Sequence, residues 1–331
     1  MAPVALTIGN FDGVHLGHVA LVRACADAVT VRAGQSAARA GPTASRAGKV
    51  IVLAFDPHPS VLLRPAHAPA RLTSFDERAA LLVAAGASEV VRLTPTPELL
   101  DQSAEDFLAG VLSRFEPAFI AEGEDFRFGK GRAGTVATMA KLAASRGCTV
   151  QVVAPVEVTL NDHTIVRASS SLVRWLLTHG RVADAARLLG RPYEFIGTVQ
   201  QGDRIGRTIH IPTANVVSDC LMPMNGAYAG VGTLPDGTRL PAAINVGMRP
   251  TVNGLQRRVE VHLLRPPQEQ WGPLPNLPEY GWTLRVAFHH FLRDEMKFPG
   301  LPALLGQIHR DIARVGQLVA APAVALSPAN A

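Results

Sequence analysis

Cysteine is scarce in this chain, and its placement excludes two kinds of site. The 331 residues contain three cysteines, Cys25, Cys148 and Cys220, which lie far apart and form no C-x-x-C pair. An odd number of widely spaced cysteines fits neither a disulfide framework nor a thiolate zinc site. We therefore expect three buried or incidental thiols.

The chain also lacks long apolar runs and any concentration of basic residues. No uninterrupted apolar run approaches the ~20 residues that a helix needs to cross a bilayer. Because no basic segment followed by an apolar one opens the sequence, we expect a cytoplasmic protein without a membrane partner. The net charge of +5 is dispersed, with no stripe of basic and aromatic residues, so nucleic acid is not expected as a partner. Small phosphorylated ligands explain the positive charge.

The Walker phosphate loop, G-x-x-x-x-G-K-[ST], is absent as well, which disfavours a Walker-type ATPase. A different glycine-rich segment, G-N-F-D-G-V-H-L-G-H at residues 9–18, lies between an apolar run, Val4–Ile8, and an amphipathic helix predicted over Val19–Ala28. At a helix N-terminus, glycines let the backbone approach an anion, and free amides and the helix dipole favour its negative charge. Residues 9–18 therefore predict a phosphate site.

The H-x-G-H spacing adds two side-chain donors to this predicted site. His15 and His18 can reach the same phosphate and donate hydrogen bonds to oxygens that gain charge during nucleotidyl transfer. The alternative is that both histidines lie on the surface or cap the helix.

The first half of the chain predicts a parallel sheet. Residues 31–48 are small and polar, so a flexible surface loop is expected there. Strand and helix patterns then alternate over Val50–Phe55, Phe75–Ala85, Glu89–Leu93, Ala104–Arg114, Ala118–Ala121, Val136–Ser145 and Thr149–Val153. Such alternation indicates βαβ units, whose ligands bind beyond the carboxyl ends of the strands. The histidine segment, Asp56–Pro59 and Gly123–Gly129 all fall at such ends.

From about Gly190 the pattern changes to short strands between Gly, Pro and Asp turns, which predicts an antiparallel barrel. The expected strands are Phe195–Gln200, Ile209–Ile211, Ala227–Thr233, Leu240–Val246, Arg258–Leu264 and Thr283–Leu292, followed by a helix over Leu301–Leu318. The length allows two domains, and we place them at residues 1–186 and 187–318, with a frayed tail at 319–331.

Several shorter motifs are ambiguous on their own. Gly123–Gly131 carries two aromatics and basic groups, which suits a planar ring beside a phosphate or an ordinary turn. The serines of Arg167–Arg174 can cap a helix, expected to run through Leu177 and Gly180, or bind a phosphate. Thr213 and Asn215 follow a glycine loop in P-T-A-N and could hold a nucleotide phosphate and Mg²⁺, or form a turn. Strand alternation places Glu260 and His262 on one face.

Taken in order, these segments resemble the bacterial bifunctional riboflavin kinase/FAD synthetase family over residues 4 to 316. The motifs G-N-F-D-G-V-H-L-G-H, F-D-P-H-P, G-E-D-F-R-F-G and S-S-S-x-V-R look like the FMN adenylyltransferase half. L-L-G-R-P-Y, P-T-A-N, G-A-Y-A, N-V-G-M-R-P-T and V-E-V-H-L look like the kinase half. The resemblance implies an N-terminal Rossmann-like nucleotidyltransferase domain and a C-terminal riboflavin kinase-like barrel with a terminal helix.

The resemblance also implies the substrates and the residues that bind them. It implies ATP as co-substrate, riboflavin, FMN and FAD as substrates or products, and Mg²⁺. In the first half it implies His15 and His18 as catalytic residues, phosphate contacts from Gly9, Asn10, Phe11, Asp12, Gly13, Arg167, Ser170, Ser171 and Arg174, and flavin contacts from His58, Asp125, Phe126, Arg127 and Phe128. In the second half it implies Glu260 as general base for the ribityl hydroxyl, ATP contacts from Gly202, Gly206, Thr213 and Asn215, and Mg²⁺ on Thr213 and Asn215.

Three departures from the family pattern leave alternatives open. His210 and Ile211 stand where the family usually has a glycine and an aromatic, and a side chain there could crowd the nucleotide phosphates. Ser171 replaces a threonine, and Pro266–Tyr280 lacks the usual acidic connection. The alternatives are an enzyme in which only the adenylyltransferase site is active, an enzyme that acts on a flavin analogue, or a non-catalytic flavin or nucleotide sensor. A monomer or weak homo-oligomer is expected.

Overall fold

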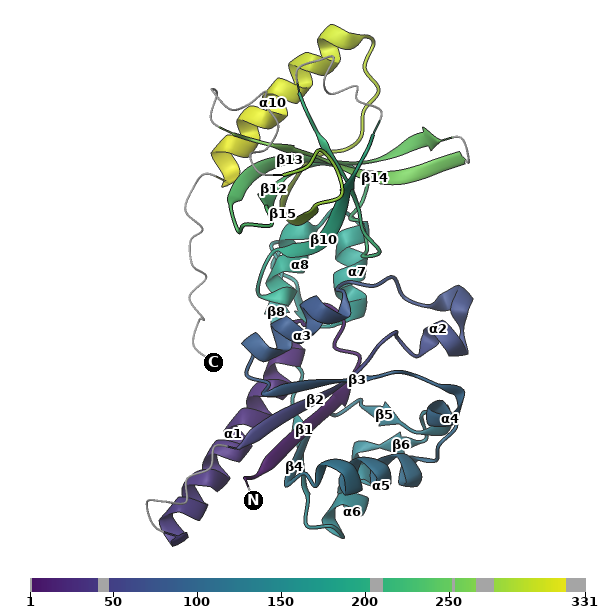
Figure 1. Ribbon diagram of the computed structural model, residues 1–331, viewed down its shortest axis with the longest axis vertical. Helices are drawn as coiled ribbons and strands as arrows, with labels where there is room; N and C mark the ends of the chain where they lie inside the picture. The colour runs from purple at the N-terminus through teal and green to yellow at the C-terminus, as the bar shows by residue number, and fades with distance from the viewer. Residues whose placement is uncertain (1, 41–47, 203–210, 252–253, 266–276, 320–331) are drawn as a thin grey trace. The chain divides into compact units, whose positions relative to one another are not determined.

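The computed structural model describes residues 2–40, 48–202, 211–251, 254–265 and 277–319. Figure 1 shows the chain from its N-terminal sheet to its C-terminal barrel. The chain divides into two compact units. The first contains residues 1–159 and 164–170, and the second contains residues 160–163 and 171–331.

The first unit is built on a parallel sheet, as the alternating pattern predicted. Its strand order is β3-β2-β1-β4-β7, and the described pairs in it are parallel. The strands are β1 Val4–Gly9, β2 Lys49–Phe55, β3 Glu89–Leu93, β4 Phe119–Gly123 and β7 Thr149–Val153. The chain runs from β1 outward to β3 and then crosses to β4, so the order reverses between β1 and β4. Ligands of open α/β sheets bind at the carboxyl end of such a reversal.

Alternating side chains of this sheet bury against helices on both faces. One core joins Ala5, Val50, Val52 and Ala54 to helices α1 (Leu16–Ala40) and α3 (Phe75–Ala84). The other joins Leu6, Ile8, Ile51 and Leu53 to α5 (Ala104–Phe115) and α6 (Val136–Ala144). Strands covered on both faces read as continuous apolar runs, which is why β1 and β2 were recognisable in the sequence. The shorter elements are α2 Ser60–Leu63, α4 Pro97–Leu100, two 3-10 helices at Pro65–His67 and Lys130–Arg132, and the strands β5 Arg127–Phe128, β6 Gly134–Thr135, β8 Glu157–Thr159 and β9 Ile165–Arg167.

The predicted flexible loop over residues 31–48 is wrong for its first ten residues. Helix α1 continues to Ala40, although the prediction ended it at Ala28. Alanine, arginine and glutamine are strong helix formers, so this stretch can extend an existing helix by propensity alone. Residues 41–47 lie outside the described part of the chain.

The second unit is the predicted antiparallel barrel, closed in the order β10-β11-β14-β13-β12-β15. Its strands are β10 Tyr193–Gln200, β11 Ala214–Val217, β12 Gly226–Thr233, β13 Arg239–Thr251, β14 Gly254–Leu263 and β15 Thr283–Arg293. The interior is filled by aromatic and branched side chains, among them Tyr193, Phe195, Tyr228 and Phe288.

One predicted strand of the barrel, Ile209–Ile211, is described only at its last residue. Ile211 lies outside any strand, and the second barrel strand is β11, which begins at Ala214. Pro212 explains the shift, because proline cannot donate to a strand ladder and is tolerated mainly at strand starts and edges. Residues 209 and 210 of the predicted strand lie outside the described residues.

Among its described residues, the second unit also has the helices α7 Ser170–Thr178, which starts at the unit boundary, α8 Val182–Leu189, and α10 Leu301–Val319. Helix α8 packs on β10 and β15, and α10 packs on β12, β13 and β15. Gly180 lies beyond the end of α7 with φ +72°, so the expected helix through Gly180 is wrong. Glycine is favoured there because a left-handed residue commonly ends a helix. The predicted boundary after residue 186 falls within α8, and the predicted tail beyond Val319 lies outside the described residues.

Candidate functional site

The histidine segment forms the turn between β1 and α1, at the carboxyl edge of the parallel sheet. The turn has left-handed residues at Phe11 (φ +50°), Gly13 (φ +82°) and Val14 (φ +44°). Such a conformation is strained for a branched residue such as Val14. Phe11 and Val14 are only 1% and 2% exposed, so their burial in the sheet's core holds the backbone in this shape.

His15 has the place of an N-cap residue, and one of its ring nitrogens takes part in the cap. Its Nδ1 accepts the Gly17 N–H at 3.1 Å, and its carbonyl accepts the N–H groups of His18 and Val19 at 2.8 and 3.1 Å. Because Nδ1 is the acceptor, a neutral ring carries its proton on Nε2. The capping alternative and the phosphate-donor prediction are therefore compatible.

The two imidazoles lie against each other. The rings of His15 and His18 stack with centroids 3.7 Å apart, and Phe11 meets His18 edge-on at 5.1 Å. A Cβ on Gly17 would lie 3.0 Å from Cε1 of His15, so the middle glycine of H-x-G-H leaves room for this ring. The spacing predicted from the sequence thus brings both rings together at the start of α1.

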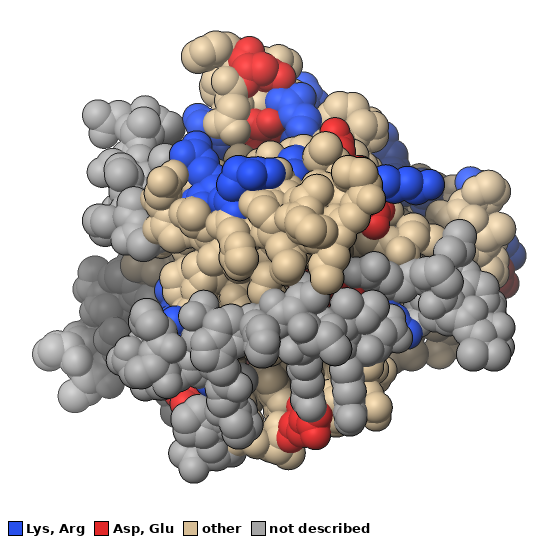
Figure 2. All heavy atoms as spheres, turned by 90° about the horizontal axis from the view of Figure 1, so that it is seen from above, with Lys and Arg blue, Asp and Glu red and all other residues tan. Residues whose placement is uncertain are grey.

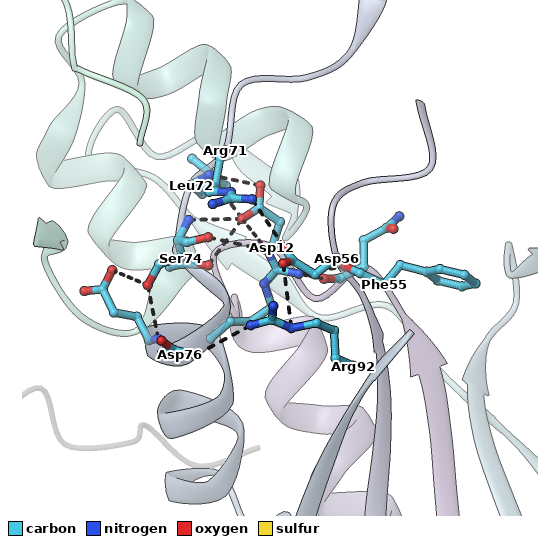
Figure 3. A network of polar contacts seen from close by, with 12 residues as sticks. Asp12, Phe55, Asp56, Arg71, Leu72, Ser74, Asp76 and Arg92 are labelled. Atoms are coloured by element: carbon cyan, nitrogen blue, oxygen red, sulfur yellow. Dashed lines mark hydrogen bonds and ion pairs between the residues drawn. The ribbon is translucent and has the colours of Figure 1, made fainter. Parts of the chain in front are cut away.

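The carboxylate of Asp12 anchors the turn to a neighbouring loop. It accepts hydrogen bonds from the N–H groups of Leu72 and Thr73 at 3.0 to 3.1 Å and from the Thr73 hydroxyl at 3.2 Å. Thr73 Oγ1 accepts in turn from the Gly13 N–H at 3.1 Å. Figure 3 shows Asp12 facing Leu72 and Arg71 in this network. Asp12 was predicted to contact phosphate, and here its side chain binds protein donors.

Arg78 is a member of this network that the sequence analysis did not single out. It lies on α3 and is 3% exposed, on the same helix face as Leu82. An arginine at an apolar position of an amphipathic helix was the signal that could have identified it. Burial lowers the pKa of Arg78, while Asp12 and Asp56 act in the opposite direction.

The other predicted residues of the first unit come to the same edge of the sheet. Asp56 follows β2 and pairs with Arg71 and Arg78, each at 3.4 Å, and Nδ1 of His58 accepts the Ser60 N–H at 3.1 Å. Ser170 donates to the Asp12 carbonyl at 2.7 Å. Arg167 pairs with Glu124 after β4 at 3.2 Å. Ser171 and Arg174 follow in α7, which belongs to the second unit.

The predicted flavin contacts after β4 differ in exposure. Phe128 is 6% exposed and belongs to the core with Phe107, whose ring centroid is 6.1 Å away. Phe126 is partly buried and stacks on Phe128 at 5.8 Å. Arg127 is exposed and donates to the Phe126 carbonyl, and the Asp125 carboxylate lies beside Gly123. As the structure stands, Phe126 and Arg127 offer more free surface to a ligand than Phe128.

In the second unit, the barrel brings three polar side chains into one row. Glu260 on β14 lies directly opposite Asn215 on β11 and Asn245 on β13. Opposite residues of adjacent strands share a face, so the three side chains are neighbours. On the other face Val259 and Val261 are 0% and 1% exposed, as the alternation predicted.

The predicted glycine loop abuts this row. A Cβ on Gly202 would lie 2.1 Å from Nδ2 and 2.7 Å from Oδ1 of Asn215, so only glycine leaves room for this amide. Thr213 is half-buried just before β11. Gly206 and His210 lie outside the described residues, and Ile211 is 5% exposed, so its side chain packs inward.

His262 lies on the same face of β14 as Glu260, and it also contacts the P-T-A-N segment. Its Nδ1 lies 2.8 Å from the Pro212 carbonyl and donates to it, which leaves Nε2 without a hydrogen-bonding partner among the described residues. Burial lowers the pKa of His262. The neutral ring therefore ties β14 to the start of P-T-A-N.

Comparison with known proteins gives a family for each unit. The FAD synthetase family matches residues 1–169, and the riboflavin kinase family matches residues 189–319. A bifunctional riboflavin kinase/FMN adenylyltransferase of Escherichia coli K12 is 34% identical over 316 residues, which span 92% of this chain and 90% of that protein. The protein of the same description from Haemophilus influenzae is 34% identical, with 93% and 92% covered. This chain belongs to the bifunctional riboflavin kinase/FMN adenylyltransferase family.

Membership of the bifunctional riboflavin kinase/FMN adenylyltransferase family assigns the two sites to different halves. The histidine turn and its Asp12 network lie in the part matched by FAD synthetase, and the row of Asn215, Glu260 and Asn245 lies in the part matched by riboflavin kinase.

A solved structure has a similar fold. A crystal structure described as a macrolide-efflux protein from Streptococcus pneumoniae gives a TM-score of 0.77 at 26% identity and covers 95% of this chain and 94% of its own. In the part of this chain that the structure describes, no helix is both long and apolar enough to cross a membrane. Figure 2 views the molecule from above, where basic side chains form several groups separated by uncharged residues.

Proposed function

We propose that this chain transfers the γ-phosphate of ATP to riboflavin, giving FMN and ADP, and then transfers the AMP part of a second ATP to FMN, giving FAD and pyrophosphate. The proposal is supported by the family match of each half, by the stacked rings of His15 and His18 at the start of α1, and by the row of polar residues around Glu260 on β14. Both steps move a phosphorus group between substrates, so each site needs to bind and orient phosphates.

For the adenylyl transfer, we assign phosphate binding to the start of α1 and to His15 and His18. The phosphate oxygen of FMN attacks the α-phosphorus of ATP, and pyrophosphate leaves. Nε2–H of His15 and the ring of His18 donate to oxygens that gain charge in the transition state. Arg167, Ser170, Ser171 and Arg174 remain proposed phosphate contacts, and His58, Asp125, Phe126, Arg127 and Phe128 remain proposed flavin contacts. Asp12 is reassigned to shaping the turn, because its carboxylate already accepts protein hydrogen bonds and would repel a phosphate.

For the kinase step, we assign the general base to Glu260. Its carboxylate takes the proton of the ribityl 5′-hydroxyl as that oxygen attacks the γ-phosphorus, and ADP leaves. Asn215 and Thr213 offer neutral oxygens beside it, and Gly202 leaves the space that the Asn215 amide fills.

Mg²⁺ is proposed to accompany ATP at this kinase site. The described residues contain no group of three or more His, Cys, Asp or Glu that could hold a metal ion. Mg²⁺ commonly takes few protein ligands and is held largely by substrate phosphates, so Thr213 and Asn215 with ATP suit it. When bound, the ion would neutralise charge on the transferred phosphoryl group.

The proposed activities are tested by incubating the chain with Mg-ATP and either riboflavin or FMN and separating the flavins by chromatography. FMN and FAD from riboflavin, and FAD from FMN, are expected. FAD from FMN without FMN from riboflavin would leave only the adenylyltransferase, and no turnover with bound flavin would indicate a sensor. The same assay with flavin analogues tests the substrate. We also propose a cytoplasmic monomer or weak homo-oligomer without a nucleic-acid partner, which sedimentation with and without nucleic acid would test.

Substituting Glu260 tests the proposed base. Glu260→Gln keeps the size of the side chain but removes its basicity, so riboflavin phosphorylation should fall by about 10²- to 10⁴-fold. Riboflavin binding should change much less, because the proton moves only in the transition state. FMN adenylylation by the same variant is the internal control. A kinase rate close to the parent's would show that Glu260 is only a strand residue.

A further inference from the structure

Arg78 is the one described residue whose side chain binds the histidine turn, the end of β2 and the loop before α3 together. Its Nη1 donates to the carbonyls of Asn10 and Phe55 at 3.0 and 2.9 Å. Its Nη2 donates to Oδ1 of Asp56 and to the Thr73 carbonyl, each at 3.4 Å. The planar guanidinium therefore fixes the relative positions of three segments that meet at the carboxyl edge of the sheet.

Burying the Arg78 guanidinium costs desolvation free energy, which an apolar side chain at the same place would not cost. Arg78 is 3% exposed, and its Nε has no hydrogen-bonding partner among the described residues. Asp56 and Asp12 lie 3.4 and 3.7 Å from Nη2 and are 8% and 6% exposed, so the positive charge is balanced by two buried carboxylates. Replacing such a group with packed apolar residues is often neutral or stabilising. The presence of Arg78 beside the proposed phosphate turn is better explained by the geometry that it imposes.

The three segments each carry a part of the proposed adenylyltransferase site. Asn10 begins the turn that holds His15 and His18, and Phe55 and Asp56 lead to His58. Thr73 binds the Asp12 carboxylate and the Gly13 N–H, so the turn is held from both sides. A shift of Arg78 would move the imidazoles relative to the loop after β2.

We propose that Arg78 is a positioning residue for adenylyl transfer, acting through the Asn10 carbonyl on the histidine turn. The inference rests on the proposed function of that turn. Arg78 itself is buried beneath the turn and acts on the reaction only through it. Misplacing catalytic groups by about 1 Å can reduce a rate by about 10²-fold while substrates still bind. The effect of Arg78 should therefore fall on kcat rather than on KM.

The test compares Arg78→Lys with Arg92→Lys. Lysine keeps the charge, but its single ammonium cannot reproduce the planar fork that spans the carbonyls of Asn10 and Phe55 together with Asp56. Arg92 also pairs with Asp56, at 3.9 Å, but it is 48% exposed and is paired with Asp56 and Asp76 rather than with the turn. The control thus changes the same carboxylate's surroundings without touching Asn10.

We expect Arg78→Lys to lower kcat for FAD formation from FMN by at least about tenfold, with KM for ATP and FMN within about threefold of the parent. Arg92→Lys should keep the parental kcat, and riboflavin phosphorylation should be unchanged in both variants. A folded Arg78→Lys protein with the parental kcat would overturn the proposal. Equal losses in the two variants would also overturn it, because charge balance at Asp56 would then be the cause.

Thermal unfolding of each variant separates positioning from folding. Should Arg78→Lys unfold at the assay temperature, the charge-balanced double variant Arg78→Gln/Asp56→Asn is used, because it leaves no extra buried charge. A folded double variant with lowered kcat and parental KM supports the proposal, and one with parental kcat overturns it. Unfolding of both variants would make Arg78 a residue of the fold alone and overturn the positioning role. A parent protein that makes no FAD would instead contradict the proposed function, before any variant is compared.

Discussion

At the scale of single residues, the ring of His15 has two nitrogens with different tasks. Nδ1 caps α1 through the Gly17 N–H, and Nε2 is the proposed donor to phosphate. Glutamine can place an amide donor near the position of Nε2, whereas asparagine is too short. We expect FAD formation from FMN to fall by about 10²-fold or more in His15→Asn, and by less in His15→Gln.

Rates of FAD formation for the two His15 variants, with riboflavin phosphorylation as the control, check this expectation. A smaller loss in His15→Asn than in His15→Gln would mean that the capping role of Nδ1, not donation from Nε2, is what the reaction needs, because the asparagine oxygen lies near the position of Nδ1.

A second residue, Glu122, makes the stability of the first unit depend on pH. It is 1% exposed in β4, and Oε1 accepts the Ile8 N–H at 2.6 Å. Burial raises the pKa of Glu122 well above its ordinary value of 4.5. Below that value the carboxyl is protonated in both the folded and the unfolded chain. As the pH rises above it, the unfolded chain loses the proton first, so the folded state loses stability until the raised pKa is passed.

Glu122→Gln removes this titration and keeps an acceptor for the Ile8 N–H. The variant should therefore become more stable relative to the parent as the pH rises from 5.5 to 8. The difference between their free energies of unfolding should grow by about 1.4 kcal/mol per pH unit at most, and the difference between their unfolding temperatures should grow with it. Thermal unfolding at several pH values measures the difference. A difference that stays constant, or shrinks as the pH rises, would contradict the assignment.

Residues such as Arg78 and Glu122 mark the limit of what the sequence could predict. His15, His18 and Glu260 lie in motifs whose spacing is local, so they could be predicted without coordinates. Arg78 and Glu122 act on segments that are 68 and 114 residues away in the sequence, and their partners are largely backbone groups. Backbone partners leave no signal in a sequence, so only the fold could identify these contacts.

At the scale of elements, Gly202 couples the end of β10 to the start of β11. Because a Cβ at this position would lie 2.1 Å from Nδ2 of Asn215, Gly202→Ala should displace the Asn215 amide from the row that it forms with Glu260. We expect KM for ATP in the kinase step to rise by about tenfold or more. Riboflavin binding should change little.

Gly316→Ala provides a matched control in the same unit. Gly316 lies in α10 with nothing within 4 Å of a Cβ, so alanine should be tolerated and should favour the helix slightly. Steady-state kinetics of both variants test the coupling. An unchanged KM for ATP in Gly202→Ala would show that Asn215 is not needed for nucleotide binding.

The helices and strands also show where the apolar pattern of the sequence predicts an element correctly and where helix propensity decides instead. The continuous apolar runs of β1 and β2 were confirmed because packing on both faces leaves a clear signature. The prediction for residues 31–40 was wrong because it weighed core contacts, whereas alanine-rich helices extend by propensity. Strand β11 was missed because four residues after a proline carry too short a pattern to separate from a turn.

At the scale of the whole molecule, helices α7 and α8 make contacts that we expect to stabilise the barrel. Helix α8 packs on β10 and β15, and the Met224 N–H donates to the Leu177 carbonyl at 2.9 Å. A chain that starts at Ser171 should therefore unfold cooperatively and at a higher temperature than one that starts at Gly190. Calorimetry of the two truncated chains measures this. Equal unfolding temperatures would place the independent barrel boundary near Gly190.

The closed barrel also has a consequence for the order in which the halves mature during synthesis. Its first strand pairs with its last, Tyr193 opposite Phe288, so the ring cannot close until β15 has left the ribosome. The parallel sheet of the first unit is complete at β7, near residue 153, while more than a hundred residues are still to be translated. A nascent chain halted before residue 283 would carry a finished N-terminal sheet and strands β10 and β12 with exposed edges. Protection of those edges during translation therefore falls to other factors or to rapid completion of the chain.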